Sequence, residues 1–181
     1  MDTLDGGMSS TAVARESSTA ELRPLSDKWV LWAHLPHDTD WTIGSYKKIM
    51  EVGSVEAIVA LYSALPDKLL KNCMLFLMKG GVTPTWEDPA NRDGGCFSFK
   101  VSNKNVSKAW KTLSYMLVGC TLVREGKLEK LLNGITISPK RAFCIIKIWL
   151  ASCAVQNPRK LEPVYGLEMH GCLFRKHKPE Y

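Results

Sequence analysis

Hydrophobic residues along the chain fall into short runs or into every second position, a pattern that is typical of β-strands. Phe97, Phe99 and Val101, for example, alternate with polar residues and predict a strand with one wet face. Strands are expected over residues 27–35, 73–78, 96–101, 134–137 and 143–150. The turn sequence SPKR separates the last two and predicts a β-hairpin.

Three other segments have the apolar spacing of amphipathic helices. One helix is expected from Ser54 to the break at Pro66, a second from Ser107, and a third from about Pro158 to Gly171. Strands at both ends of this order, with helices between them and hairpin-type links, predict an α+β fold with a mainly antiparallel sheet.

The first 21 residues differ in composition from the rest of the chain. They are rich in Ser, Thr, Ala and Gly and contain few large apolar side chains, so they cannot bury enough surface to offset the entropy of ordering. We expect a disordered tail over residues 1–21 and one folded domain over residues 22–181.

Charge and hydropathy then narrow the class of protein. The net charge is +6, and because residues 1–21 hold one Arg against four carboxylates, the excess of positive charge lies in the folded part. A basic domain favours a polyanionic partner such as nucleic acid. The longest uncharged apolar runs have six residues, whereas a membrane span needs about 20. We therefore expect no membrane partner and a cytoplasmic location, with the nucleus as a second one.

Motifs of enzymes and metal sites are scarce. The six cysteines form no CxxC pair and have no histidine at zinc-site spacing, which predicts reduced, structural thiols. The motifs GxxxxGK[ST], GxGxxG, HExxH and GxSxG do not occur in the sequence. The sequence favours a binding protein over an enzyme, with no cofactor and no metal.

Two of the six tryptophans, Trp41 and Trp86, lie in polar, turn-rich segments. A large indole gains little in such a loop unless a ligand or partner covers it. Two indoles that face each other form a slot for a planar ring, and each stacked base contributes about 1 to 3 kcal/mol. The other four, Trp29, Trp32, Trp110 and Trp149, lie in apolar segments that are typical of a core.

Glu87 follows Trp86 directly, and a carboxylate suits the two adjacent N–H donors of guanine. A cationic ring such as N7-methylguanine would add a cation–π interaction of up to about 2 kcal/mol. Lys140 and Arg141 in the hairpin turn are candidates for contacting phosphates. A different possibility is that Glu87 and Asp88 hold a divalent metal in a nuclease or nucleotide hydrolase.

Six segments, in order and at matching spacing, carry a family resemblance: RPLSDKWVLW, DWT, SVEAIVALY, PTWEDPANRDGG, AWKTLSYMLVG and KIW. Over Arg23 to Trp149 the sequence resembles eukaryotic translation initiation factor 4E, the family that binds the 7-methylguanosine cap of messenger RNA. The resemblance implies a curved antiparallel sheet with about three helices on its convex face and a cap slot on the concave side.

Residue by residue, the resemblance assigns roles in that slot. Trp41 and Trp86 correspond to the stacking indoles, and Glu87 corresponds to the carboxylate on the guanine edge. Trp149 is similar to the family tryptophan that contacts the N7-methyl group. Lys140 falls where the family has an arginine on the cap phosphates.

Two positions depart from the family pattern of phosphate binding. Ile145 stands where the family has a second lysine, and Cys96 replaces an arginine. Arg141 or the basic residues near the C-terminus could substitute. These departures also favour an alternative, a repressor or interaction module with weak cap affinity.

The resemblance further implies a convex surface for a scaffold factor of the 4G type or for 4E-binding repressors. The corresponding residues here are Pro24, Leu25, Val55, Val59, Trp110 and Leu113. Val59 replaces a family tryptophan that anchors the partner, which predicts altered specificity. Val55 and Val59 could instead simply complete the core.

Overall fold

Seven strands, five of them predicted and two (Lys47–Ser54 and Leu173–Lys176) not, pair into one antiparallel sheet within residues 22–179, the part of the chain that the computed structural model describes. The tail expected over residues 1–21 lies outside these residues. The strands are β1 (Pro24–His34), β2 (Lys47–Ser54), β3 (Met74–Lys79), β4 (Gly95–Ser102), β5 (Leu132–Pro139), β6 (Phe143–Leu150) and β7 (Leu173–Lys176). Their spatial order is β2-β1-β3-β5-β6-β4-β7.

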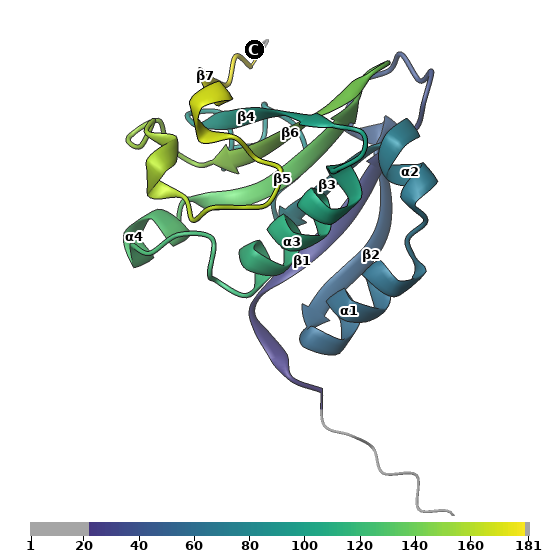
Figure 1. Cartoon of the computed structure of the whole chain (residues 1–181), viewed down its shortest axis with the longest axis horizontal. Coiled ribbons are helices and arrows are strands. Elements are labelled where there is room, and N and C mark those ends of the chain that lie inside the picture. Colours follow the sequence, from purple (N-terminus) through teal and green to yellow (C-terminus); the bar gives the residue numbers. More distant parts are fainter. Residues whose placement is uncertain (1–21, 180–181) are drawn as a thin grey trace, which may run out of the picture.

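Helices cover one face of this curved sheet (Figure 1). They are α1 (Val55–Ala64), α2 (Asp67–Asn72), α3 (Val106–Val118) and the short α4 (Gly126–Glu129). The first helix begins where its sequence predicts, because the Ser54 hydroxyl accepts a hydrogen bond from the amide of Ala57 at 3.1 Å. The α+β class and the curved, antiparallel sheet are confirmed.

The main core lies between the sheet and the helices. Alternate residues of the strands, such as Leu31, Leu77 and Ile148, point to this side and pack against Trp110 and Leu117 of α3. The intervening strand residues face the other side of the sheet, because successive side chains of a strand point in opposite directions.

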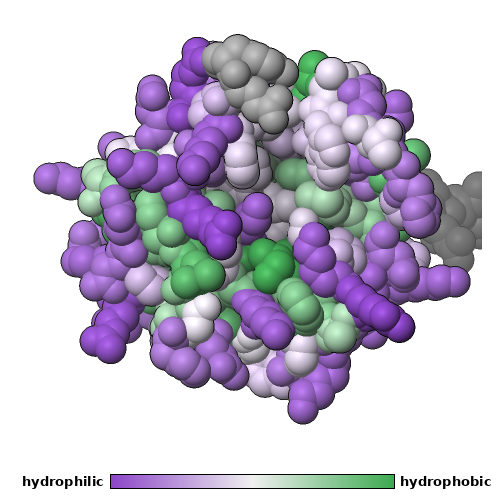
Figure 2. Space-filling view, turned by 90° about the horizontal axis from the view of Figure 1, so that it is seen from above, coloured by the Kyte–Doolittle hydropathy of each residue, from purple (hydrophilic) through white to green (hydrophobic). Residues whose placement is uncertain are grey.

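A second, smaller apolar cluster lies on the helix-free, concave face, and we refer to it as the concave cluster. Its members are the buried Phe76, Met78, Cys96 and Trp149 and the partly buried Trp32, Tyr46, Met74, Val82 and Trp86. Figure 2, which views the molecule from above, shows hydrophobic side chains near the middle of that side of the surface, with mostly hydrophilic side chains around them.

The helix predicted from Pro158 to Gly171 is wrong. This segment contains only two 3₁₀ turns, Pro158–Lys160 and Met169–Gly171, with irregular chain between them. Leu161, Val164 and Leu167 are buried nonetheless, so their spacing reflects contact with the core rather than a helix. The chain then forms β7, an edge strand beside β4 that the sequence pattern does not predict.

Candidate nucleotide-binding site

Trp41 stands in the loop after β1, with 55% of its surface exposed. One face of its indole lies flat on the ring of His34, with centroids 4.1 Å apart and planes within 2°. His34 is buried on the concave face at the end of β1, opposite Met74 of β3. Trp41 is therefore held from behind while much of its surface stays open to solvent.

Short hydrogen-bonded turns hold this loop in place. His34 Nε2–H donates to the carbonyl of Asp40 at 2.8 Å, which ties the base of the loop to its tip. The Asp40 carboxylate accepts from the amide of Thr42 at 2.8 Å and from its hydroxyl at 3.0 Å. These two bonds lower the pKa of Asp40, the amide bond most strongly. The sequence DTDWT thus forms the Asx turns that its Asp and Thr residues favour.

Trp86 is carried by the loop from Gly80 to Gly94, which crosses the concave face between β3 and β4. Asp88 closes the loop by accepting from the amide of Thr83 at 2.7 Å and from the amide of Ala90 at 2.8 Å. The fully buried Asn91 donates to the carbonyls of Thr83 and Thr85 and receives a bond from Asn133 of β5. This hydrogen-bond network holds the long loop in one conformation, which its composition alone does not predict.

A histidine also packs against Trp86. The His177 ring lies 5.8 Å from the Trp86 ring at 14°, and 4.7 Å from the Trp149 ring at 50°. Its Nδ1–H donates to the carbonyl of Asn91 at 2.7 Å. Burial lowers the pKa of His177, and Lys147 acts in the same direction while the Asn91 bond opposes it. The imidazole is thus kept neutral between two indoles.

Ring contacts lead from Trp41 to the concave cluster against which Trp86 packs. Tyr46 packs edge-on against His34 at 5.1 Å and against Phe76 at 5.3 Å, and Phe76 belongs to the concave cluster that includes Trp86. Burial raises the pKa of Tyr46 to about 12, and the negative charge of the nearby Glu87 adds to this shift. Trp41, Trp86 and Glu87 consequently border one aromatic surface.

Lys140 and Arg141 are exposed at the tip of the β5–β6 hairpin. The register places this tip at the end of the sheet where β1 ends, which is also the end that carries the Trp41 loop. Ile145 lies next to them on β6 and contributes no charge. Cys96 is buried, and because a thiol carries no positive charge, this position offers no cation either.

The predicted partner surface divides into two groups of residues. Val59 on α1 is 48% exposed, Pro24 is exposed, and Val55 and Leu25 are half-buried. The amide of Val55 donates to the carbonyl of Arg23 at 2.9 Å, which joins the start of β1 to the start of α1.

Trp110 and Leu113 correct the prediction, because both side chains are 0% exposed. Each faces the sheet from α3 and belongs to the main core, so neither can touch a partner on the surface. The half-buried Tyr115, with the Nζ of Lys111 5.7 Å from its ring centroid, lies on the outer part of the same helix instead.

Sequence reasoning missed three residues of the concave site, His34, His177 and Lys147. Lys147 Nζ lies 5.9 Å from the Trp86 ring centroid. The alternation of β6 could have placed Lys147 on the same face as Trp149, since the two are separated by one residue. Nothing local in the sequence relates either histidine to an indole.

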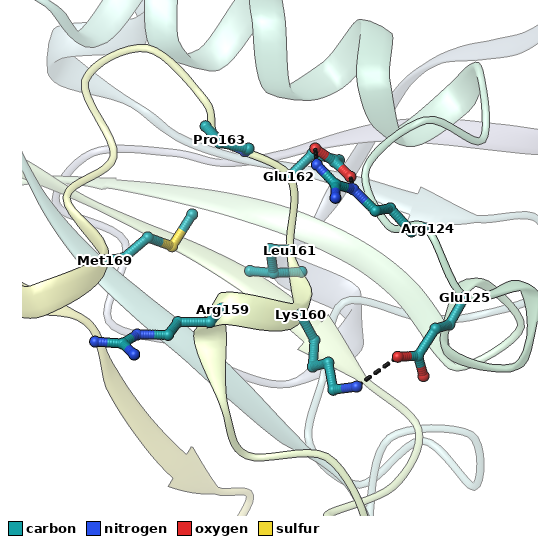
Figure 3. A pocket seen from close by; sticks show the side chains of 8 residues that line it. All are labelled: Arg124, Glu125, Arg159, Lys160, Leu161, Glu162, Pro163 and Met169. Carbon is teal, nitrogen blue, oxygen red and sulfur yellow. Dashed lines mark hydrogen bonds and ion pairs between the residues drawn. The ribbon is translucent and has the colours of Figure 1, made fainter.

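Two clefts lie outside the surface bordered by Trp41 and Trp86, and one of them adjoins the concave cluster. One of about 530 Å³ lies beside the foot of the Trp86 loop and includes Trp32 and Val82 in its lining. The other, of about 430 Å³, lies between Met169 and the segment after α3 (Figure 3). Ion pairs of Arg124 with Glu162 and of Lys160 with Glu125 line it, so its charges largely cancel.

Residues 22–179 contain neither a candidate membrane span nor a candidate metal site. No helix there is long and apolar enough to cross a membrane. Within the same residues, no three His, Cys, Asp or Glu side chains are grouped in a way that could hold a metal ion.

The fold and the sequence together define a family. The model of the family described as eukaryotic initiation factor 4E matches residues 24–167. The chain therefore belongs to the eukaryotic initiation factor 4E family.

Similar proteins of known sequence include two initiation factors. Eukaryotic translation initiation factor 4E-2 of Schizosaccharomyces pombe is 28% identical over 79% of this chain and 60% of its own length. Eukaryotic translation initiation factor NCBP of Triticum aestivum is 37% identical over 72% of this chain and 56% of its own length. The chain thus spans about 60% of the length of these relatives.

Solved structures confirm the fold. The Schistosome eIF4E complexed with m7GpppG and 4E-BP superposes with a TM-score of 0.66 at 20% identity, covering 72% of this chain and 73% of that one. The C. elegans eIF4E-3 in complex with the 4E-binding protein Mextli and a cap analog has a TM-score of 0.68 at 20% identity, covering 77% and 80%.

Proposed function

We propose that this protein binds the 7-methylguanosine cap of messenger RNA on its concave face and recruits a partner protein for translation initiation on its helical face. The observation that carries the proposal is the convergence of Trp41, Trp86 and Glu87 on one aromatic surface. Family membership and the cap complexes of its structural neighbours support it.

The chemistry of the site fits a methylated guanine. Trp41 and Trp86 would stack on the two faces of the ring, and Glu87 would accept from the N1–H and the N2 amino group. The cationic ring gains from the electron-rich faces of the indoles, which favours methylated over plain guanine. Trp149, on the same face, is proposed to contact the N7-methyl group, and Lys140 and Arg141 are proposed to contact phosphates.

Titration of the purified protein with 7-methyl-GTP and GTP, followed by tryptophan fluorescence, tests this proposal. We expect selective quenching by the methylated ligand and a loss of about 10- to 100-fold in affinity for Trp86→Ala and for Glu87→Gln. Glu168→Gln is the matched control: its carboxylate is exposed, pairs with His170 and is not part of the concave cluster, so this variant should bind as the unmodified protein does. An equal response to both nucleotides would refute cap reading.

The helical face is the proposed docking surface for a scaffold factor of the 4G type or a 4E-binding repressor. An exposed Val59 beside the half-buried Val55 and Leu25 supports it, as does the 4E-BP in the Schistosome complex. Val59→Trp should tighten binding of a 4E-BP peptide at least tenfold, because a tryptophan fills far more of an apolar groove. Val59→Asp should abolish binding, and isothermal calorimetry measures both; unchanged affinity in both variants would contradict this surface.

A second candidate is a repressor or interaction module of the same fold with weak cap affinity. The buried Cys96 and the uncharged Ile145 favour it, because they remove two cations from the concave face. Weak quenching by 7-methyl-GTP together with tight binding of the peptide would select this alternative over an initiation factor.

The third candidate, a metal-dependent nucleotide hydrolase using Glu87 and Asp88, has less support. Both oxygens of Asp88 already accept hydrogen bonds from Thr83 and Ala90, which holds that carboxylate in the loop. We therefore propose a non-enzymatic function, carried out in the cytoplasm with the nucleus as a second location. Unchanged 7-methyl-GTP after incubation with Mg²⁺ or Mn²⁺ is the expected outcome.

A further inference from the structure

Strand β6 presents a lysine in the middle of the concave face. Ile145, Lys147 and Trp149 point to this side, since Ile146 and Ile148 between them are buried in the main core. Lys147 is opposite Thr136 of β5 on one side and opposite Ser98 of β4 on the other. Its half-buried side chain is thus fixed between two short hydroxyl residues at the centre of the sheet.

A second cation lies one strand further out. Arg175 of β7 is opposite Cys96 of β4, and Cys96 is in turn opposite Trp149 (Figure 1 shows β6, β4 and β7 side by side). Burial raises the pKa of the Cys96 thiol, while the charges of Lys147 and Arg175 both oppose that shift. The two cations therefore flank the same buried thiol.

These cations lack the usual anionic partners. Within residues 22–179 neither Lys147 nor Arg175 forms an ion pair. The Oγ1 of Thr136, next to Lys147, is buried and has no hydrogen-bond partner. An ammonium without an ion-pair partner, beside a hydroxyl without a hydrogen-bond partner, offers two donors to an anion.

We infer that Lys147 and Arg175 bind the 5′-phosphates of the nucleotide whose base stacks on Trp86. The inference rests on the proposed function and goes beyond it, because it adds two phosphate contacts on the sheet itself to those proposed for Lys140 and Arg141 at the hairpin turn. The 5.9 Å between Lys147 Nζ and the Trp86 ring places this charge within reach of groups attached to a ring stacked there. Lys147 lies on β6, two residues after Ile145. Arg175 lies on β7, opposite Cys96 of β4.

The experiment compares 7-methylguanosine, 7-methyl-GMP and 7-methyl-GTP, titrated against the full chain and its variants. In Lys147→Gln the affinity for 7-methyl-GTP should fall roughly tenfold, about 1.4 kcal/mol, and the affinity for the nucleoside should stay the same. Lys147→Gln with Arg175→Gln should lower the 7-methyl-GTP affinity further. Lys108→Gln is the matched control, because this lysine also lies over a ring, that of Tyr165 at 4.1 Å, but on the helical side.

Each other outcome has a separate meaning. Equal losses for nucleoside and triphosphate would overturn the inference, because Lys147 would then only support the Trp86 ring. Unchanged 7-methyl-GTP affinity in both variants would overturn it as well, while the proposed function would stand. No binding of any of the three ligands by the unmodified chain would refute the proposed function and this inference together.

Discussion

At the scale of single residues, both loop tryptophans rest on buried histidines. His34 lies under Trp41, and His177 lies against Trp86. In each histidine one ring N–H is used by a backbone carbonyl, so the ring orientation is fixed. At Trp86, the lowered pKa of His177 favours the neutral imidazole, which packs on the indole without adding a positive charge that would repel a cationic ring.

His177 gives a pH dependence of stability. Its pKa is held below the ordinary value of 6.5, mainly by burial, so the unfolded chain binds a proton more readily than the folded one. The contribution to the free energy of unfolding is therefore complete above about pH 6.5 and is lost as the pH falls through the lower, folded-state pKa. Urea unfolding at pH 7.5 and at pH 5 measures this loss.

The variant His177→Gln should reduce the difference in stability between the two pH values. His170→Gln is the matched control, since His170 is largely exposed and should leave the difference as it is. If His177→Gln and the unmodified chain lost equal stability on acidification, other groups would have to account for the whole effect.

At the scale of elements, the Trp86 loop is a folded unit held by amides. Asn91 connects its two ends through Thr83 and Thr85, and Asn133 anchors it to β5. Asn91→Ala would remove the donor to two carbonyls and leave the amide of Asn133 with its bond to the Ala90 carbonyl alone, so we expect a loss of about 3 kcal/mol in the free energy of unfolding. Cap affinity should fall as well, although Asn91 is not proposed to touch the ligand.

Chemical denaturation and the 7-methyl-GTP titration test this prediction together. Asn72→Ala provides the comparison: the Asn72 side chain is exposed and bonds only to the carbonyl of Lys68, at 2.7 Å. Its removal should change stability by less than about 0.5 kcal/mol. Wild-type affinity in a stable Asn91→Ala protein would mean that the loop does not need this network.

Elements with a local signal were predictable, and those defined by distant contacts were not. Ser54 and Pro66 mark the ends of α1 in the sequence, and the SPKR turn marks the β5–β6 hairpin. By contrast, β7 is short and largely exposed, and only its pairing with β4 makes it a strand. The helical spacing of the 158–171 segment was misleading, because an irregular chain can bury residues at the same intervals.

The candidate site follows the same rule. The position of Trp41 and Trp86 in polar loops was visible in the sequence, so their exposure on a binding face could be predicted. The positions of His34 and His177 beside the indoles depend on contacts between distant segments, which no local pattern gives, whereas the alternation of β6 does place Lys147 on the face of Trp149. The burial of Trp110 and Leu113 was predictable from the apolar face of α3, but the family comparison assigned them to a surface.

At the scale of the whole molecule, β7 closes one edge of the sheet and brings the C-terminal segment to the site. Phe174 packs edge-on against Phe97 at 5.2 Å, and it crosses so close to Gly95 that a side chain there would meet its ring at 2.6 Å. His177 then reaches Trp86 and Trp149. One short strand thus links the stability of the β4 edge to the geometry of the concave face.

A chain that ends at Cys172 tests this link. Loss of the Phe174 contact and of the β4 pairing should lower the free energy of unfolding by about 2 kcal/mol or more, and the uncovered β4 edge should promote self-association. A chain that ends at Lys178 keeps β7 and His177, so it should remain stable and monodisperse. Urea unfolding and light scattering distinguish the two. Equal stability and equal scattering would show that β4 does not need β7, whereas loss of 7-methyl-GTP binding in the shorter chain alone would tie the C-terminal segment to the concave site.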